Sequence, residues 1–277
     1  AYIMNKFARF RYQPCIPLGE DGRCITASKK HIKLTREAAA EGMVLLKNET
    51  EALPLQKKEK IALFGKATIE YIKGGGGSGD VYCPYIRNIY EGFRMKEDEG
   101  KVEIYTPLVD FYKKYVEEES VNVLTQEQIN ARWDIVNNME FCTLRDDMTY
   151  DTFAAMHVPE AKVPDELIEQ SAKNADTAII TLSRFSAEGV DRRPQGNDYY
   201  LSDLEKDLID KACSLFSKVI IVINSGAVID SLASKSVIDF MIDTEGTAAH
   251  AFIASTLAGA PYTAADLAGS VHPLVRT

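Results

Sequence analysis

The sequence predicts an α/β fold, a three-layer sandwich in which a mostly parallel sheet carries helices on both faces. Short segments dense in Val and Ile alternate with amphipathic segments, and such apolar strands are typical of parallel sheets that are buried on both sides. The chain has 277 residues, of which 45% are hydrophobic and 26% charged. This composition is ordinary for a globular protein that buries a sizeable core.

The first half of the chain begins irregularly and then alternates between helix and strand. Residues 1–30 contain several Pro and Gly residues and are predicted to form an extended arm, which leaves residues 31–277 for the sandwich domain. Apolar residues at helical spacing predict a helix over Leu34–Lys47, for which Thr35 can serve as N-cap. Similar patterns predict strands over 60–64 and 102–105, and helices over 87–96, 107–119 and 126–136, with residues 137–160 rich in loops.

The second half of the chain alternates more clearly. A helix over 165–173 precedes a continuous apolar strand over 176–183. Ser202 and Glu205 form a capping-box pattern at the start of a helix over 202–216. Further strands are expected over 218–224 and 237–242, and further helices over 227–233 and 247–257.

Charge and composition argue against several classes of partner. The formal net charge of −9 disfavours nucleic acid and anionic membrane surfaces, because both require a basic face. The five cysteines include no Cys-x-x-Cys pair and the four histidines are scattered, so we expect neither a disulfide framework nor a metal site. No secretory signal is visible near Ala1 and no segment resembles a membrane span, so we expect a cytoplasmic protein.

A run of glycines, Gly74–Gly79, formally matches the G-x-G-x-x-G dinucleotide fingerprint. That motif requires a strand directly before it and a helix directly after it. Here the expected strand ends about ten residues earlier, and Pro84 follows where a helix would begin. Nucleotide binding is therefore disfavoured. The loop is either a surface turn or a segment that lies flat against a ligand or a partner domain.

The loop over Arg184–Arg193 is the strongest functional signal in the chain. It follows the apolar strand 176–183, and in open α/β sheets ligands bind at the carboxyl ends of the strands. Glu188 lies in this loop between small residues and is followed by acidic and basic residues. It is either a proton donor to a substrate or a solvated loop acid. Asp191 and Arg192 can pair with each other or with neighbouring charges and so support the base of the loop.

Four segments in order resemble the α/β sandwich domain of glycoside hydrolase family 3, the β-glucosidase family. They are residues 34–48 (LTREAAAEGMVLLKN), 60–65 (KIALFG), 74–81 (GGGGSGDV) and 184–192 (RFSAEGVDR). The resemblance extends over roughly residues 30–260. The N-terminal arm is similar to that of members in which this domain, C-terminal in other members, precedes the catalytic (β/α)₈ barrel.

The resemblance implies a retaining glycosidase that acts on a β-linked glucoside or a short oligosaccharide. In such an enzyme the barrel supplies an aspartate nucleophile, and Glu188 would be the general acid/base. Gly76, Gly77 and Ser78 would border the aglycone side of the pocket, and Arg184 would contact the substrate. The family requires no metal and no organic cofactor, so no cofactor is expected.

The sequence also departs from the family pattern. Ala187 stands where Gly is usual, and the tail from Gly259 lacks the Asn-Pro-x-Gly-x-Leu segment. A barrel takes ~250 residues, and no Ser/Thr-Asp-Trp nucleophile signature is present. The chain is therefore expected to be nearly inactive without a barrel domain or subunit. The alternative is a non-catalytic carbohydrate-binding or assembly module. An apolar face left uncovered by a missing barrel would favour a homo-oligomer.

Overall fold

The computed structural model describes residues 28–48, 52–72, 85–186, 190–226, 229 and 249–255. Its elements are α2 (Lys29–Glu41), β1 (Met43–Lys47), β2 (Glu59–Phe64), η1 (Lys66–Thr68), α3 (Ile89–Asp98), β3 (Val102–Ile104), α4 (Thr106–Glu119), η3 (Ser120–Asn122), α5 (Gln126–Asn137), α6 (Thr143–Ala154), α7 (Asp165–Asn174), β4 (Thr177–Arg184), α8 (Asp203–Leu215), β5 (Lys218–Ser225) and β6 (Ala249–Ser255). The predicted N-terminal arm lies outside the described residues, apart from its last three positions.

The strands form one six-stranded sheet in the order β1-β6-β5-β4-β2-β3. Neighbouring strands from β6 to β3 run parallel, and β1 alone pairs antiparallel at the edge. Every residue of β4 is buried, as expected for a central strand covered on both faces. The predicted fold class, a mostly parallel α/β sandwich, is confirmed.

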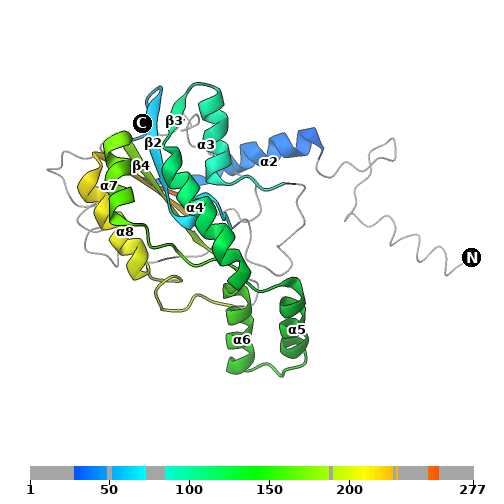
Figure 1. The fold of residues 1–277 in the computed structure, drawn as a ribbon. Helices are drawn as coiled ribbons and strands as arrows, with labels where there is room; N and C mark the ends of the chain where they lie inside the picture. Colours follow the sequence, from blue (N-terminus) through cyan, green and yellow to red (C-terminus); the bar gives the residue numbers. More distant parts are fainter. Residues whose placement is uncertain are drawn as a thin grey trace, which may run out of the picture.

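Helices cover both faces of the sheet, and each face has its own apolar core. On one face, Phe64 of β2 and Ile180 of β4 pack with residues of α4, α7 and α8, the three helices that lie across the sheet in Figure 1. On the other face, Leu63 and Ile179 pack with Phe93 of α3. Alternate residues of β2 and β4 thus point to opposite layers, which is the period of a strand.

The predicted helix over Leu34–Lys47 is wrong at both ends. The helix α2 begins after Ser28, whose side chain accepts a hydrogen bond from the His31 N–H, and it ends at Glu41. Residues 43–47 form β1 instead, where intermediate and exposed residues alternate. A short apolar run fits either element, and the backbone partners that β6 offers decide in favour of a strand.

The predicted helix over 247–257 is also wrong, because Ala249–Ser255 forms β6. Its alanines favour a helix by propensity, but its backbone pairs with β5 on one side and β1 on the other. The sheet context overrides a preference of a few tenths of a kcal/mol per residue. Two further predictions lie outside the described residues, namely the strand over 237–242 and, except for Ile229, the helix over 227–233.

Residues 120–160 contain more helix than expected. The predicted helix over 126–136 is present as α5, but the region beyond it forms α6 rather than loops alone. The α6 sequence, TLRDDMTYDTFA, mixes polar and apolar residues and has no sharp apolar face. In Figure 1 the α5–α6 pair projects below the sheet. Within the described segments, no helix combines the length and the hydropathy needed to cross a bilayer.

Candidate active site at the carboxyl edge of the sheet

The strand order places a topological switch point between β2 and β4, because the chain leads from β2 to β3 on one side and from β4 to β5 on the other. Ligands of open parallel sheets bind outside the carboxyl ends of the strands at such a point. The segment after β2 contains the glycine loop, and the segment after β4 contains Glu188. Gly76, Gly77, Ser78 and Glu188 lie outside the described residues, which flank them on both sides.

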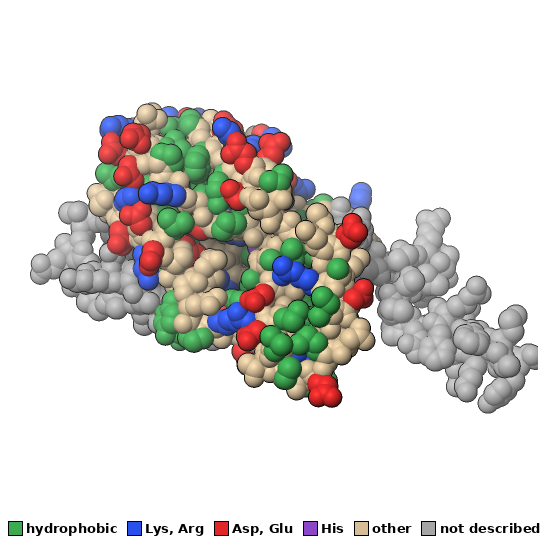
Figure 2. Space-filling view, turned by 60° about the horizontal axis from the view of Figure 1, so that its bottom comes forward, with side chains coloured by type: hydrophobic (Ala, Val, Ile, Leu, Met, Phe, Trp, Pro, Cys, Tyr) green, Lys and Arg blue, Asp and Glu red, His purple; other side chains and the backbone are tan. Residues whose placement is uncertain are grey.

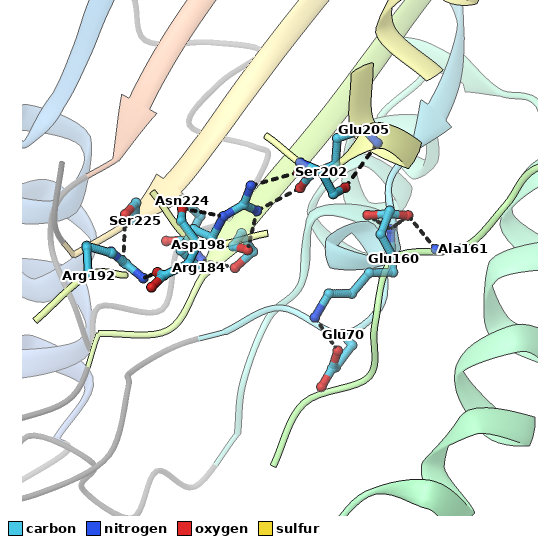
Figure 3. Close-up of polar contacts among 12 residues, drawn as sticks. Glu70, Glu160, Ala161, Arg184, Arg192, Asp198, Ser202, Glu205, Asn224 and Ser225 are labelled. Atoms are coloured by element: carbon cyan, nitrogen blue, oxygen red, sulfur yellow. Dashed lines mark hydrogen bonds and ion pairs between the residues drawn. The ribbon is translucent and has the colours of Figure 1, made fainter. Parts of the chain in front are cut away.

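Arg184, the last residue of β4, forms a buried ion pair with Glu205 of α8 (Figure 3). Its Nη1 and Nη2 each donate to one oxygen of Glu205 at 2.7 Å, and the two side chains are only 3% and 2% exposed. Its Nε donates to the Asp198 carbonyl and Nη1 also donates to the Ser183 carbonyl. This bidentate ion pair fixes the start of the Glu188 loop on α8. These bonds use four of the five N–H groups of Arg184.

Asp198 binds two residues of the segment after Glu188 and one residue of α6. Its fully buried carboxylate accepts from Nη1 of Arg192 at 2.6 Å and from the backbone N–H of Arg193 at 2.6 Å. Burial and a hydrogen bond to Asp198 raise the pKa of the Tyr150 hydroxyl, which brings α6 to the same carboxylate. A buried carboxylate that gathers donors from several segments fixes those segments relative to one another.

Arg192 bridges the Glu188 loop to the end of β5. Besides its pair with Asp198, its Nη2 donates to Oγ of Ser225 at 3.1 Å (Figure 3). Asp191, which we expected to share the supporting role, is exposed and forms no ion pair with any residue in the described ranges. Of the two predicted supporting residues, Arg192 therefore has the contacts for such a role.

The end of β5 also holds the residues that precede the glycine loop. Nδ2 of Asn224 donates to the carbonyl of Ile72 at 2.7 Å and to Oγ of Ser183 at 3.1 Å. Gly226 lies so close to Ser186 that an added Cβ would come within 2.8 Å of the Ser186 Cβ. The segments that follow β2, β4 and β5 are thus tied together at one edge of the sheet.

An apolar cluster fixes the described residues on either side of Glu188. Phe185 packs with Ile72, Tyr150 and Phe153, and Val190 packs against the same cluster. The ring centroids of Phe185 and Tyr150 are 5.2 Å apart. The chain therefore enters and leaves residues 187–189 at one cluster, which α6 completes.

A second polar cluster holds the start of the segment after β2. Glu160 accepts the backbone N–H groups of Lys66 and Ala161, each at 3.0 Å, and burial raises the pKa of Glu160 to about 7. Nζ of Lys66 lies 2.6 Å from Glu70 (Figure 3). Glu70 also faces His157. Burial acts to raise the pKa of Glu70, but the bond to His157 and the charge of Lys66 lower it.

Sequence reasoning missed three of these residues or their roles. Glu205 was predicted as a capping-box residue, which is confirmed, but its pair with Arg184 was not foreseen. Asn224 gives a usable signal, since it is a polar residue at the end of an apolar strand. Asp198 lies in an irregular segment and gives none. In the part of the chain that the structure describes, no three His, Cys, Asp or Glu side chains are arranged to hold a metal ion.

Comparison with known families gives a direct match to this architecture. Residues 43–272 match the model of the glycosyl hydrolase family 3 C-terminal domain. The chain belongs to this family. The match includes the sheet, both loops of the switch point and the residues that fasten them.

Relatives in the family are named β-glucosidases. β-Glucosidase A of Butyrivibrio fibrisolvens is 40% identical over 250 residues, which cover 82% of this chain and 26% of that protein. The β-glucosidase of Ruminococcus albus is 28% identical over 202 residues, which cover 73% of this chain and 18% of that protein. The family 3 chain thus spans about a quarter or less of the length of these two relatives.

Solved structures have the same fold. β-Glucosidase 3B of Thermotoga neapolitana, in complex with glucose, superposes with a TM-score of 0.66 at 30% identity, covering 95% of this chain and 30% of that one. The β-glucosidase of Paenibacillus barengoltzii gives a TM-score of 0.66 at 24% identity, covering 88% of this chain and 23% of that one. The second likeness is one of fold alone.

Proposed function

We propose that this chain is the acid/base-bearing domain of a retaining β-glucosidase, with Glu188 as the general acid/base. The observation that carries the proposal is the fastening of both flanks of residues 187–189 at the switch point. Arg184 is fixed on α8 before them, and Arg192 is fixed on Asp198 after them. A general acid must be held within hydrogen-bond reach of the oxygen that it protonates, and a loop with anchored ends meets that need.

The proposed reaction has two steps. In the first, an aspartate of the barrel attacks the anomeric carbon while the Glu188 carboxylic acid donates its proton to the departing glycosidic oxygen. The aglycone leaves as an alcohol, and the sugar stays bound to the enzyme as an ester. In the second, the Glu188 carboxylate takes a proton from water, which attacks the anomeric carbon and releases the sugar with retained configuration.

The other predicted site residues have supporting parts in this proposal. Gly76, Gly77 and Ser78 border the aglycone side, where the absence of large side chains lets the backbone approach a ligand. Arg184 mainly fixes the loop, since its guanidinium is bound to Glu205 and to two backbone carbonyls. Asn224 holds Ile72 and thereby the entrance to the glycine loop.

Hydrolysis requires a (β/α)₈ barrel that carries the nucleophile and binds the sugar. We propose that this domain precedes the barrel in the complete protein. A β-linked glucoside or short oligosaccharide would then bind between the barrel and the edge formed by the segments after β2 and β4. Protonation without a nucleophile gives little catalysis, so the 277-residue chain by itself should hydrolyse glucosides very slowly.

The test is Glu188→Gln in the chain combined with a barrel domain, with Glu169→Gln as the matched control. Glu169 is an exposed carboxylate on α7. Loss of the acid should lower kcat/KM for an alkyl β-glucoside by about 10²–10⁴-fold. A dinitrophenyl β-glucoside, whose leaving group needs no proton, should lose much less in the first step. Full activity of Glu188→Gln on the alkyl glucoside would contradict the assignment.

A further inference from the structure

The guanidinium of Arg193 is held by three side chains of one face of α6. Its Nη1 lies 2.9 Å from Oδ1 of Asp151, and its Nη2 lies 2.9 Å from Oδ1 of Asp147. Its Cζ lies 3.8 Å from the centroid of the Tyr150 ring. Nη2 also donates to the backbone carbonyl of Asp147 at 3.1 Å. Asp147, Tyr150 and Asp151 share a helix face because they are three and four residues apart.

The helix α6 is a firm support for this contact. Phe153 and Tyr150 enter the apolar cluster that contains Phe185, and the Phe153 ring lies 4.8 Å from that of Trp133 on α5. Charged and apolar side chains lie next to one another over the lobe that α5 and α6 form in Figure 2. The α5–α6 pair thus contacts Phe185, three residues before Glu188, by apolar packing, and it contacts Arg193, five residues after Glu188, by charge.

We propose that Arg193 is a positioning residue that clamps the Glu188 loop to α6 and so sets the orientation of the acid/base. This inference rests on the proposed function of Glu188. Two residues hold the downstream flank at different depths. The Arg192–Asp198 pair is buried, whereas Arg193 is 27% exposed and its partners Asp147 and Asp151 are 55% and 61% exposed.

The exposure of the clamp makes it sensitive to salt. Ion pairs between exposed groups weaken as ionic strength rises, while a buried pair such as Arg192–Asp198 is screened much less. Removal of Arg193 also leaves two carboxylates on successive turns of α6, and these repel each other. The clamp should therefore be lost by mutation of Arg193 or by ~1 M salt, while the buried pair still holds the loop.

The backbone reports directly on the clamp, because the Gln195 and Tyr199 amides donate to the carbonyl of Arg193 at 2.8 and 3.2 Å. Arg193→Ala should speed hydrogen exchange at these two amides by about tenfold at low salt, with little change at high salt. Lys211→Ala is the matched control. Lys211 also lies between two carboxylates, Asp165 at 2.6 Å and Asp207 at 2.7 Å, but it links α7 to α8.

If these two amides exchange at the same rate in Arg193→Ala and wild type at low salt, the proposed clamp is wrong. Exchange that rises as much in Lys211→Ala also overturns it, because the effect is then general destabilisation. A charge swap tests the pairing itself: Arg193→Glu should speed exchange, and adding Asp151→Arg should restore it. A swap that fails to restore the exchange rate shows that the pairing does not hold the loop.

Activity in the barrel-containing protein tests the effect on Glu188. Arg193→Ala should lower kcat for an alkyl β-glucoside by about tenfold, leave kcat for a dinitrophenyl glucoside nearly unchanged, and recover partly in Arg193→Lys. An equal loss on both substrates overturns the positioning role. Glu188→Gln separates the two proposals: if it keeps full activity, the proposed function fails, whatever Arg193 does to exchange.

Discussion

The two edges of the sheet both have buried charges, but the charges connect different parts of the molecule. At the amino edge, Glu59 at the start of β2 accepts from Thr177 at the start of β4 and from Lys218 at the start of β5, the last at 2.7 Å. These bonds join three neighbouring strands to one another. At the carboxyl edge Asn224 also makes one strand-to-strand bond, to Ser183, but Arg184 and Asn224 further bind groups that belong to a helix and to loops.

This difference indicates which edge is built for stability and which for function. Strand-to-strand bonds at the amino edge add to a sheet that the two apolar cores already define. Polar side chains at the carboxyl edge instead hold irregular backbone, which has no ladder of its own. Holding loops with buried charges is expensive in desolvation, so such networks are concentrated where loop geometry matters.

The largest expected effect is at the carboxyl edge, in Glu205→Gln. This substitution leaves the buried Arg184 guanidinium without its counter-charge and should lower the free energy of unfolding by about 3–5 kcal/mol. Urea denaturation measures the change. Glu169→Gln on α7 is a surface control that should stay within about 0.5 kcal/mol of wild type. A loss below about 1 kcal/mol for Glu205→Gln would show that the pair is not desolvated as its burial implies.

The second effect is a pH dependence that Glu160 creates. Its pKa is raised from 4.5 to about 7, so the folded state binds a proton that the unfolded state has released. This contribution to stability is fully present below pH 4.5 and is lost as pH rises through about 7. The loss between pH 5 and 8 should be about 2–3 kcal/mol.

Glu160→Gln is the control for this pH dependence. The amide keeps an oxygen that can accept the Lys66 and Ala161 N–H groups, but it cannot titrate. Denaturation midpoints between pH 5 and 8 should therefore become nearly flat. Glu70 acts in a lower window, because its lowered pKa makes its contribution disappear only in acid. An unchanged slope in Glu160→Gln would assign the dependence to another group.

A third substitution, Lys218→Met, breaks the amino-edge network. It removes one donor from the buried Glu59 carboxylate, which keeps its bonds from Thr177 and from the Gln56 N–H. We expect a loss of about 2 kcal/mol in the free energy of unfolding. Hydrogen exchange at Gln195 and Tyr199 should not change at pH values where the protein stays folded. Faster exchange at these two amides would show that the two edges of the sheet are coupled, which would contradict the separation of their roles.

The smallest effect is expected for Asn224→Ala at the carboxyl edge. It leaves the Ile72 carbonyl without its donor and should cost about 1 kcal/mol. We expect a local effect on the backbone near Ile72 and little effect on overall stability. Limited proteolysis after Ile72 should become faster, while the urea midpoint should shift little. A matched proteolysis rate in wild type and Asn224→Ala would mean that Asn224 does not hold the glycine loop.

The sequence was sufficient for the central strands of the sheet. Runs such as Ile179-Ile180 identify buried strands, and the Ser202–Glu205 pattern identifies the start of α8. It was insufficient where tertiary pairing decides, as in β1 and β6, whose apolar or alanine-rich segments fit a helix equally well.

The sequence points to the two loops of the proposed site, but it does not point to the residues that fasten them. Position after a strand points to the Glu188 segment, since carboxyl edges collect ligands. The partners of that segment are distant in sequence: Glu205 lies 21 residues from Arg184, and Asp147 lies 46 residues from Arg193. Nothing in the local pattern around Asp198 or Asp147 distinguishes them from solvated surface acids, and only the fold brings them to the loop.

Azide rescue tests the acid/base role of Glu188 most directly. In Glu188→Ala, joined to a barrel and supplied with a dinitrophenyl β-glucoside, the second step lacks its base and should be slow. Azide needs no base, so it should restore turnover and yield β-glucosyl azide with retained configuration, while Glu169→Ala should show no azide effect. Turnover of Glu188→Ala that azide leaves unchanged, with only glucose formed, would contradict the account.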